Sequence, residues 1–441
     1  MRTLVLLLLS SLAAAALWAA LVVIGSIQGW GRQQIAPAGD ARAFMDAAIE
    51  YIKGHHPGNV AFALIEDGLL YDEYFASAGN RVDGNTRFQV ASLSKWVSAW
   101  GVLTLVEAGK LDLDAPVATY LTRWQLPDRD HDNKGVTVRR LLSHTAGLTD
   151  GLGYAGFAPG TEPQTLEASL THAADASPGA DGRVQVGIAP GTKWEYSGGG
   201  YTLLQLLIEE VSGMSFESYM QTAVLRPLGM TRSTYRLTED GADNLADSYD
   251  VGNSPATQYQ FTSLAATSLY TTTSDLRCFL QAHVAGEGSA RPGRGVLKPA
   301  TIELMRQPHA SKMGADIWGL GVMLFAPNNQ GDFIIGHDGS NEPAINTTAR
   351  LDPATGDGII VLETGNPRLA TRLAGEWVFW QAGTLDFLMV TMNAGRMVAL
   401  VVGGWTAILF LAIVVGWRVR RARRNRRRSV ESSDPSPIAA R

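Results

Sequence analysis

The sequence has a single cysteine, Cys278, among 441 residues. An intramolecular disulfide is therefore excluded, and a domain of this chain that faces outward must rely on its hydrophobic core for stability. Cys278 lies in the helix-like stretch "DLRCFLQAH", where we interpret it as a small buried apolar residue without a chemical role.

Several motifs of metal sites and hydrolases are also missing. No H-E-x-x-H occurs, and the adjacent His55 and His56 have no companion ligands for zinc. The acidic loop Asp128 to Gly135 has Asn133 where a calcium loop requires glycine, and Arg139 where it requires a bidentate glutamate. No G-x-S-x-G occurs, which weakens an α/β-hydrolase interpretation. We therefore predict no metal and no cofactor.

Charge is scarce and unevenly placed. The formal net charge is −5, but the segment Arg418 to Arg428 alone carries eight arginines, which leaves −13 for the rest of the chain. An acidic soluble part argues against nucleic acid as a partner. The arginine run directly follows an apolar segment, so membrane topology explains it better.

Two long uncharged runs lie near the ends of the sequence. Residues 397–417 contain 21 residues without a charge, enough to cross a ~30 Å hydrocarbon layer. The other run, Leu4 to Ile27, is longer than the apolar part of an ordinary signal peptide, so both a retained anchor and a cleaved signal peptide fit residues 1–29. Because arginines mark the cytoplasmic side, we predict a cytoplasmic tail at 418–441, and we place the domain at 40–385 outside the cytoplasmic membrane with membrane lipid as a partner.

The chain between these runs has strands at both ends and helices in the middle. Val60 to Ile65 and Leu69 to Phe75 predict a hairpin, and a helix is expected to start near Ser92. Further on, Tyr201 to Gly213 predicts a helix that ends at its glycine. The segments "DFIIGH", "INTTARLD" and "GIIVLETG" predict three adjacent strands, followed by a helix over 368–383. This pattern favours an α/β (α+β) fold with one sheet built from distant segments, a helical insertion, and a cleft between them.

The stretch "VASLSKW" places Ser92 three residues before Lys95, one of only seven lysines in the chain. On a helix, residues three apart lie on one face, so a hydroxyl and an amine could touch. A chance S-x-x-K is expected roughly 0.4 times in such a chain, so this spacing alone decides nothing.

Three more stretches follow Ser92 in order: "LLSHTAGL" at 141–148, "YSGGG" at 196–200 and "HDGS" at 337–340. Together with "ASLSK" they resemble the serine hydrolases of the penicillin-recognising superfamily. This superfamily includes class C β-lactamases, low-molecular-mass DD-peptidases, and related esterases and D-amino-acid peptidases. The resemblance covers roughly residues 45–385 and implies a β-lactamase/transpeptidase-like fold, with an antiparallel sheet flanked by helices.

The resemblance also implies catalytic roles. Ser92 would be the nucleophile and Lys95 would take part in general-base chemistry, while the Ser92 backbone N–H would be an oxyanion donor. Tyr196 would exchange a proton with the nucleophile or the leaving group. Relatives carry asparagine two residues after this tyrosine, whereas this chain has Gly198, which puts efficient β-lactam hydrolysis in doubt.

The last motif fits the His-x-Gly version of a family element that is Lys-Thr-Gly in many relatives. His337 would hydrogen-bond Tyr196 or a substrate carboxylate. Gly339 would let the substrate backbone approach, and the Ser340 N–H would be the second oxyanion donor. His144 and Thr145, in "LLSHTAGL", are expected to hold the loop beside the cleft.

These observations predict a membrane-anchored serine hydrolase that acts through a Ser92 acyl-enzyme. The substrate would be an amide or ester, such as a D-amino-acid peptide, a β-lactam-like compound or a short ester. Two alternatives stay open. One is a non-catalytic or slowly acylating penicillin-binding or sensor protein of the same fold, which the Gly198 departure favours. The other is an envelope scaffold that binds no ligand.

Overall fold

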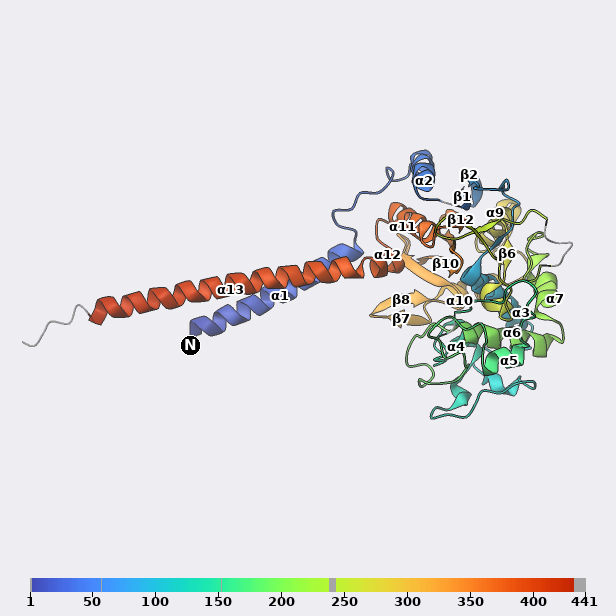
Figure 1. Cartoon of the computed structure of the whole chain (residues 1–441), viewed down its shortest axis with the longest axis horizontal. Coiled ribbons are helices and arrows are strands. Elements are labelled where there is room, and N and C mark those ends of the chain that lie inside the picture. Colours follow the sequence, from blue (N-terminus) through green and yellow to red (C-terminus); the bar gives the residue numbers. More distant parts are fainter. Residues whose placement is uncertain (1, 57, 152, 238–242, 432–441) are drawn as a thin grey trace, which may run out of the picture. The chain divides into compact units, whose positions relative to one another are not determined.

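The computed structural model describes residues 2–56, 58–151, 153–237 and 243–431 (Figure 1). Residues 1 and 432–441, the outer ends of the two predicted terminal segments, lie outside the described residues. The chain divides into two compact units, residues 33–382 and residues 1–32 with 383–441. Each unit is described by itself.

The centre of the unit 33–382 is one antiparallel sheet with the strand order β2-β1-β12-β11-β10-β9-β8-β7. Its strands are β1 (Asn59–Glu66), β2 (Leu69–Ala76), β7 (Ala310–Lys312), β8 (Ala315–Trp318), β9 (Met323–Pro327), β10 (Phe333–Asn341), β11 (Ile345–Leu351) and β12 (Gly358–Thr364). The N-terminal strand β1 pairs with the C-terminal strand β12, from Asn59 opposite Thr364 to Ile65 opposite Gly358. The predicted sheet built from distant segments is confirmed, as is the adjacency of the last three strands.

Helices cover both faces of this sheet. The ten helices are α2 (Ala41–His55), α3 (Ser94–Glu107), α4 (Val138–Leu142), α5 (Leu166–Thr171), α6 (Gly198–Ser212), α7 (Phe216–Met220), α8 (Leu264–Thr267), α9 (Thr273–Gln281), α10 (Pro299–Arg306) and α11 (Leu369–Ala382) among the described residues. Helix α11 packs against β11 and β12 on one face, and α9 packs against β1 and β12 on the other (Figure 1). Because both faces are covered, every residue of β11 and β12 is buried, and the two segments contain mostly β-branched and apolar residues.

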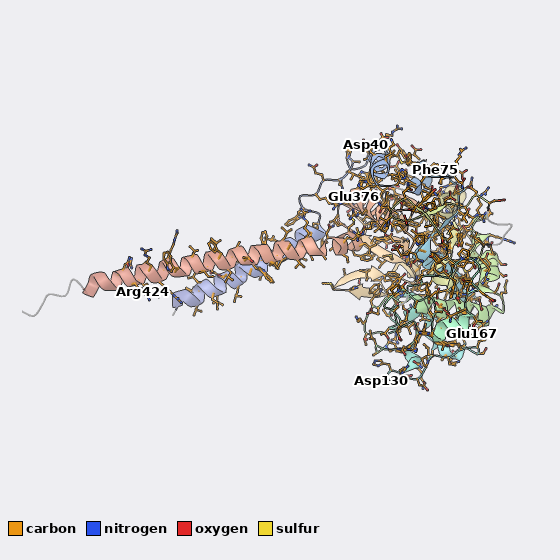
Figure 2. All side chains as sticks on the ribbon, in the orientation of Figure 1. Asp40, Phe75, Asp130, Glu167, Glu376 and Arg424 are labelled. Carbon is orange, nitrogen blue, oxygen red and sulfur yellow. The ribbon has the colours of Figure 1, made fainter. Side chains whose placement is uncertain are left out.

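The helical insertion runs from the end of β2 to the start of β7. It contains α3 to α10 and two small ribbons, β3 (Phe88–Gln89) with β6 (Tyr270–Thr271) and β4 (Ser248–Tyr249) with β5 (Pro255–Ala256). Figure 2 labels Asp130 and Glu167 on this part of the chain. Cys278 on α9 is only partly buried, which corrects the expectation of a fully buried residue, because its side chain lies at the border of the core.

The other unit consists mainly of two long apolar helices, α1 (Arg2–Ile27) and α13 (Ala394–Glu431), with the short α12 (Phe387–Met392). The two long helices lie side by side (Figure 1), and each tryptophan at their contact donates a hydrogen bond to the other helix. Trp18 Nε1 bonds to Leu400 O at 3.0 Å, and Trp405 Nε1 bonds to Ala15 O at 3.0 Å. Side chains project outward along α13, where Arg424 is labelled (Figure 2). By length and composition, both helices are long and apolar enough to cross a membrane.

Candidate active site

Ser92 lies in a single 3₁₀ turn, η1 (Ala91–Leu93), directly before α3. The residue before it, Ala91, has a positive φ of 47°, a left-handed conformation that costs an alanine on the order of 1–3 kcal/mol. Ser94 holds this turn, because its Oγ donates to Ala91 O at 2.5 Å and accepts the Leu269 N–H at 2.9 Å. Ser92 itself is half-buried. The turn thus fixes the predicted nucleophile at the start of a rigid helix while leaving its hydroxyl accessible.

The central sheet supports the same turn from the side. Thr347 on β11 donates from Oγ1 to Val90 O at 2.8 Å. A Cβ on Gly339 of β10 would lie 2.0 Å from the same carbonyl oxygen, so only glycine fits there without a shift of the backbone. The resemblance predicts that Gly339 lets the substrate backbone approach the strand. The structure shows in addition that it lets the strand lie directly against the segment before Ser92.

Lys95 points back to Ser92, as the spacing predicts. Its Nζ lies 3.2 Å from Ser92 Oγ and 2.9 Å from Ala266 O, and the side chain is 1% exposed. The Ala266 carbonyl, from α8, was not identified from the sequence because a backbone acceptor leaves no residue signal. Two fixed contacts restrict the amine to one position beside the hydroxyl.

Tyr196, on the loop before α6, lies beside Lys95. The Lys95 Nζ lies 5.0 Å from the centre of the Tyr196 ring. The following residue, Ser197, begins the helix: its Oγ accepts the Gly200 N–H at 2.8 Å and donates to Asp150 Oδ1 at 2.5 Å. Asp150 also accepts the Gly199 N–H at 3.1 Å, so its buried carboxylate stabilises the helix end that follows Tyr196. Nothing in the sequence points to Asp150, which lies 47 residues before Ser197 in the chain.

Gly198 is the first residue of α6 and is buried. Its carbonyl accepts a hydrogen bond from Thr202 Oγ1 at 3.3 Å. Glycine has no side-chain amide, whereas relatives carry asparagine at this position. This difference from the relatives therefore lies two residues from Tyr196, within the candidate site.

His337 is buried on β10, and its ring lies 5.4 Å from the ring of Trp318. Burial, together with the Lys95 charge, lowers the pKa of His337 to about 3, so the imidazole is neutral. Its Nδ1 lies 2.7 Å from Asp338 O, which places the proton on Nδ1 and leaves Nε2 as an acceptor. Among the described residues, Nε2 has no hydrogen-bond partner.

Of the two predicted partners of His337, Tyr196 forms no hydrogen bond with it among the residues that the structure describes, and a substrate carboxylate stays a prediction. Both rings instead pack against Trp318, whose ring centre is 5.8 Å from that of Tyr196. Trp318 comes from β8, and nothing in the sequence around it indicates a site residue. Its ring therefore contacts both predicted site residues.

A buried ion pair holds the strand that carries His337. Arg350 on β11 is fully buried, and its Nη2 lies 2.9 Å from Asp338 Oδ2. Thr348 donates to the same carboxylate at 2.6 Å. Asp338 therefore has its side chain on the β11 side while its carbonyl accepts the His337 proton, which fixes the orientation of the imidazole. The motif "HDGS" gives no sign of this partner twelve residues later.

The remaining predicted site residue, Ser340, follows Gly339 on β10 and is exposed. It lies opposite Asn346 of β11, and its N–H stays a predicted oxyanion donor. A surface hollow of about 420 Å³ is lined by residues such as Arg87, Glu217 and Arg232, and by none of the predicted site residues. The candidate site is therefore defined by its side chains rather than by that hollow.

Comparisons with known proteins show which family the chain belongs to. The family model described as "Beta-lactamase" matches residues 38–381. The chain is 27% identical to penicillin-binding protein 4 of Amycolatopsis lactamdurans over 72% of this chain and 83% of that protein. It is 30% identical to penicillin-binding protein 4* of Bacillus subtilis over 47% of this chain, and the match spans 45% of that relative's length.

Solved structures show the same fold. The octameric penicillin-binding protein homologue from Pyrococcus abyssi superposes with a TM-score of 0.61 at 26% identity, over 77% of each chain. A D-stereospecific amidohydrolase from a Streptomyces species superposes with a TM-score of 0.57 at 20% identity, over 80% of this chain and 97% of that one, which is a likeness of fold alone. The fold predicted from the sequence is confirmed, and the chain belongs to the β-lactamase family of serine hydrolases.

Proposed function

We propose that this protein is a membrane-anchored serine hydrolase that acts on an amide or ester through an acyl-enzyme at Ser92. The observation that carries the proposal is the pair formed by Ser92 Oγ and the buried Lys95 Nζ, 3.2 Å apart. A serine hydroxyl is a weak nucleophile unless a base removes its proton, and this distance allows the transfer.

The proposed reaction has two halves. In the first, Lys95 takes the Ser92 proton while Oγ attacks the acyl carbon, and the N–H groups of Ser92 and Ser340 stabilise the oxyanion. Collapse of this intermediate breaks the bond to the amine or alcohol, which leaves with a proton delivered through Tyr196. In the second half, water loses a proton to the same groups, attacks the ester and releases the acid and free Ser92.

The two histidines near Lys95 suit this scheme because neither adds charge. Burial lowers the pKa of His144 well below its usual value, and the pKa of His337 is also low. Of these three residues, Lys95 alone would then carry the proton taken from Ser92. Nε2 of His337 has no partner in the described part of the chain, and we propose that it receives a hydrogen bond from the substrate.

For the substrate, we propose D-amino-acid peptides and short esters ahead of β-lactams. The chain belongs to the β-lactamase family and one relative is a penicillin-binding protein, which supports an amide as the acyl donor. Gly198 lacks the amide that would hold the acyl side chain of a β-lactam, which argues against efficient β-lactam hydrolysis.

We further propose that α1 and α13 are both membrane spans and that α1 is retained. The indole N–H of Trp405 lies within the apolar part of α13, where no water is available to bond to it, and its acceptor is Ala15 O of α1. A Cβ on Gly404 would lie 1.9 Å from Trp18 Nε1, so the glycine leaves room for the indole of the other helix. Removal of α1 would leave the Trp405 donor unpaired in lipid.

The test is covalent labelling of the full-length chain in detergent with a fluorophosphonate probe. The adduct should map to Ser92, and Ser92→Ala should abolish both the label and the hydrolysis of p-nitrophenyl acetate. Ser311→Ala, at an exposed serine on β7, is the matched control and should keep both. An adduct on another residue, or equal labelling of Ser92→Ala, would contradict the proposal.

The same experiment separates the alternative of a slowly acylating binding or sensor protein, which the Gly198 departure favours. Such a protein would take up the label at Ser92 with normal stoichiometry. Its acyl-enzyme with p-nitrophenyl acetate would then accumulate, with one burst of product and no steady-state turnover.

A further inference from the structure

His144 accepts the backbone N–H groups of both residues that flank Tyr196. The N–H of Glu195 donates to His144 O at 2.8 Å, and the N–H of Ser197 donates to His144 Nδ1 at 3.1 Å. The residue between these two amides is Tyr196 itself. One residue from the distant loop 141–148 therefore fixes the backbone on both sides of the proposed proton-transfer group.

The imidazole also contacts the tyrosine ring directly. The two ring centres are 4.4 Å apart with an interplanar angle of 35°. On its other sides the imidazole packs against Tyr201 at 5.4 Å and Trp318 at 4.7 Å. The ring is thus enclosed by aromatic neighbours, and its position determines where the Tyr196 ring can lie.

The backbone of His144 pays a conformational penalty for this position. Its φ is 56°, in the left-handed region that histidine seldom adopts. The side chain is 2% exposed, and because Nδ1 accepts a hydrogen bond, the ring proton must be on Nε2. Nε2 has no hydrogen-bond partner among the described residues, so it holds a buried, unpaired N–H within this aromatic group. A strained backbone and an unpaired donor are both unfavourable for stability, and such features persist where they serve a function.

We infer that His144 is a positioning residue that holds Tyr196 in the geometry required for proton transfer. The inference rests on the proposed function, because it assigns to Tyr196 the proton transfer described there. It goes beyond the sequence-based expectation that His144 only holds a loop. Its consequence is that the contact should affect the chemical step rather than substrate binding.

Two substitutions isolate the Nδ1 contact. Glycine and asparagine both tolerate a positive φ, so neither His144→Gly nor His144→Asn adds backbone strain. Only asparagine offers a side-chain acceptor near the position of Nδ1 for the Ser197 N–H. Thr145→Val, on the same loop, removes a hydroxyl that bonds to Ser143 Oγ at 2.8 Å and touches none of the proposed site residues. It is the matched control.

The first measurement is the steady-state hydrolysis of p-nitrophenyl acetate by the full-length chain in detergent. His144→Gly should lower kcat by roughly 30- to 100-fold with KM changed less than about twofold, since a small displacement of a proton-transfer group has an effect of this size. His144→Asn should recover to within about fivefold of the unsubstituted chain, and Thr145→Val should be unchanged. Equal losses in the glycine and asparagine variants, or a normal kcat in His144→Gly, would overturn the inference.

The second measurement does not depend on turnover. A fluorotyrosine placed at position 196 should show one sharp ¹⁹F resonance in the unsubstituted chain and in His144→Asn, and a shifted or broadened resonance in His144→Gly. Identical spectra in all three would overturn the inference. If the unsubstituted chain neither labels at Ser92 nor turns over, the proposed function fails, whereas the spectra still decide whether His144 positions Tyr196.

Discussion

The two units of the chain place apolar side chains in opposite ways. In the unit 33–382, Trp96 and Trp100 on α3 are completely buried. In the helix unit, Leu17 is 62% exposed and Phe410 is 65% exposed. Both arrangements keep apolar side chains away from water if the first unit folds in water and the second is solvated by lipid. This contrast is the one expected if the helix unit is a membrane anchor, as proposed.

The two units also differ in how their polar groups are paired. In the helix unit, the indole N–H groups of Trp18 and Trp405 both bond to backbone carbonyls of the neighbouring helix. In the other unit, the buried polar atoms without a partner among the described residues include Nε2 of His144 and of His337 beside the candidate site, and the carboxyl of Glu363 on the α11 face of the sheet. Such groups are tolerated there because the two histidines and this carboxyl are held neutral, which avoids the larger cost of burying a charge.

The largest expected effect concerns the side of the membrane on which each unit lies. Moving the arginines after Trp417 across a bilayer would be very costly, so residues 418–441 should stay in the cytoplasm and Ser92 should face outward. Alkaline phosphatase fused after Gly383 should be active, and green fluorescent protein fused after Arg428 should be fluorescent. The controls are the exchanged fusions, with each reporter at the other junction. They should show neither phosphatase activity nor fluorescence. The reverse pattern would refute the topology and the substrate compartment with it.

The next effect is confined to the globular unit. Lys95→Ala and Tyr196→Phe should each lower kcat/KM for p-nitrophenyl acetate by about 10²-fold or more, because both side chains move protons in the transition state. The exposed residues Lys110 and Tyr71 provide the same substitutions as controls, and these should leave the rate unchanged. Trp405→Phe, in the helix unit, should also be neutral in detergent. A normal rate in either site variant would remove that residue from the mechanism.

A smaller effect distinguishes substrates within the site. Turnover of nitrocefin should be slow relative to that of p-nitrophenyl acetate or a D-alanyl peptide, because Gly198 lacks the amide of the asparagine found in relatives. The measurement is the ratio of kcat/KM for the three substrates on one preparation. Nitrocefin turnover as fast as that of an efficient class C enzyme would contradict this reading of Gly198.

The smallest effect is on stability and lies on the α11 face of the sheet. Burial raises the pKa of Glu363 on β12 to about 9, and the nearby Asn366 N–H offsets this only in part, without reaching hydrogen-bond geometry. The unfolded chain releases this proton near pH 4.5, whereas the folded chain keeps it up to about pH 9. The free energy of unfolding should therefore fall as the pH rises between these values.

Glu363→Gln cannot ionise and should remove that decline. Its free energy of unfolding relative to the unsubstituted chain should increase by about 2 kcal/mol between pH 5 and pH 6.5, measured by thermal unfolding of the full-length chain in detergent. Glu303→Gln, at an exposed carboxylate on α10, is the control and should show the same difference at both values. An equal response of the two variants would show that Glu363 is ionised in the folded protein.

Much of the fold was predictable because its strands and helices carry strong local patterns. The hairpin of β1 and β2, the helix that ends at Gly213 with φ 69°, and the strands β10 to β12 are all formed where the sequence predicts them. The helix near Ser92 differs in detail. It begins at Ser94, after a 3₁₀ turn, because Ala91 adopts a positive φ that no propensity of alanine would predict.

The sequence by itself determined the family, the pairing of Ser92 with Lys95 and the two apolar helices, because each depends on spacing or composition within a short segment. Only the tertiary structure decided what surrounds these residues. Three kinds of contact join segments that lie far apart in the chain. The Ala266 carbonyl bonds to Lys95, and the Trp318 ring packs against both Tyr196 and His337. His144 makes two hydrogen bonds with the Tyr196 loop. Such contacts depend on how the insertion packs against the sheet, and packing between distant segments leaves no periodic signal in either one.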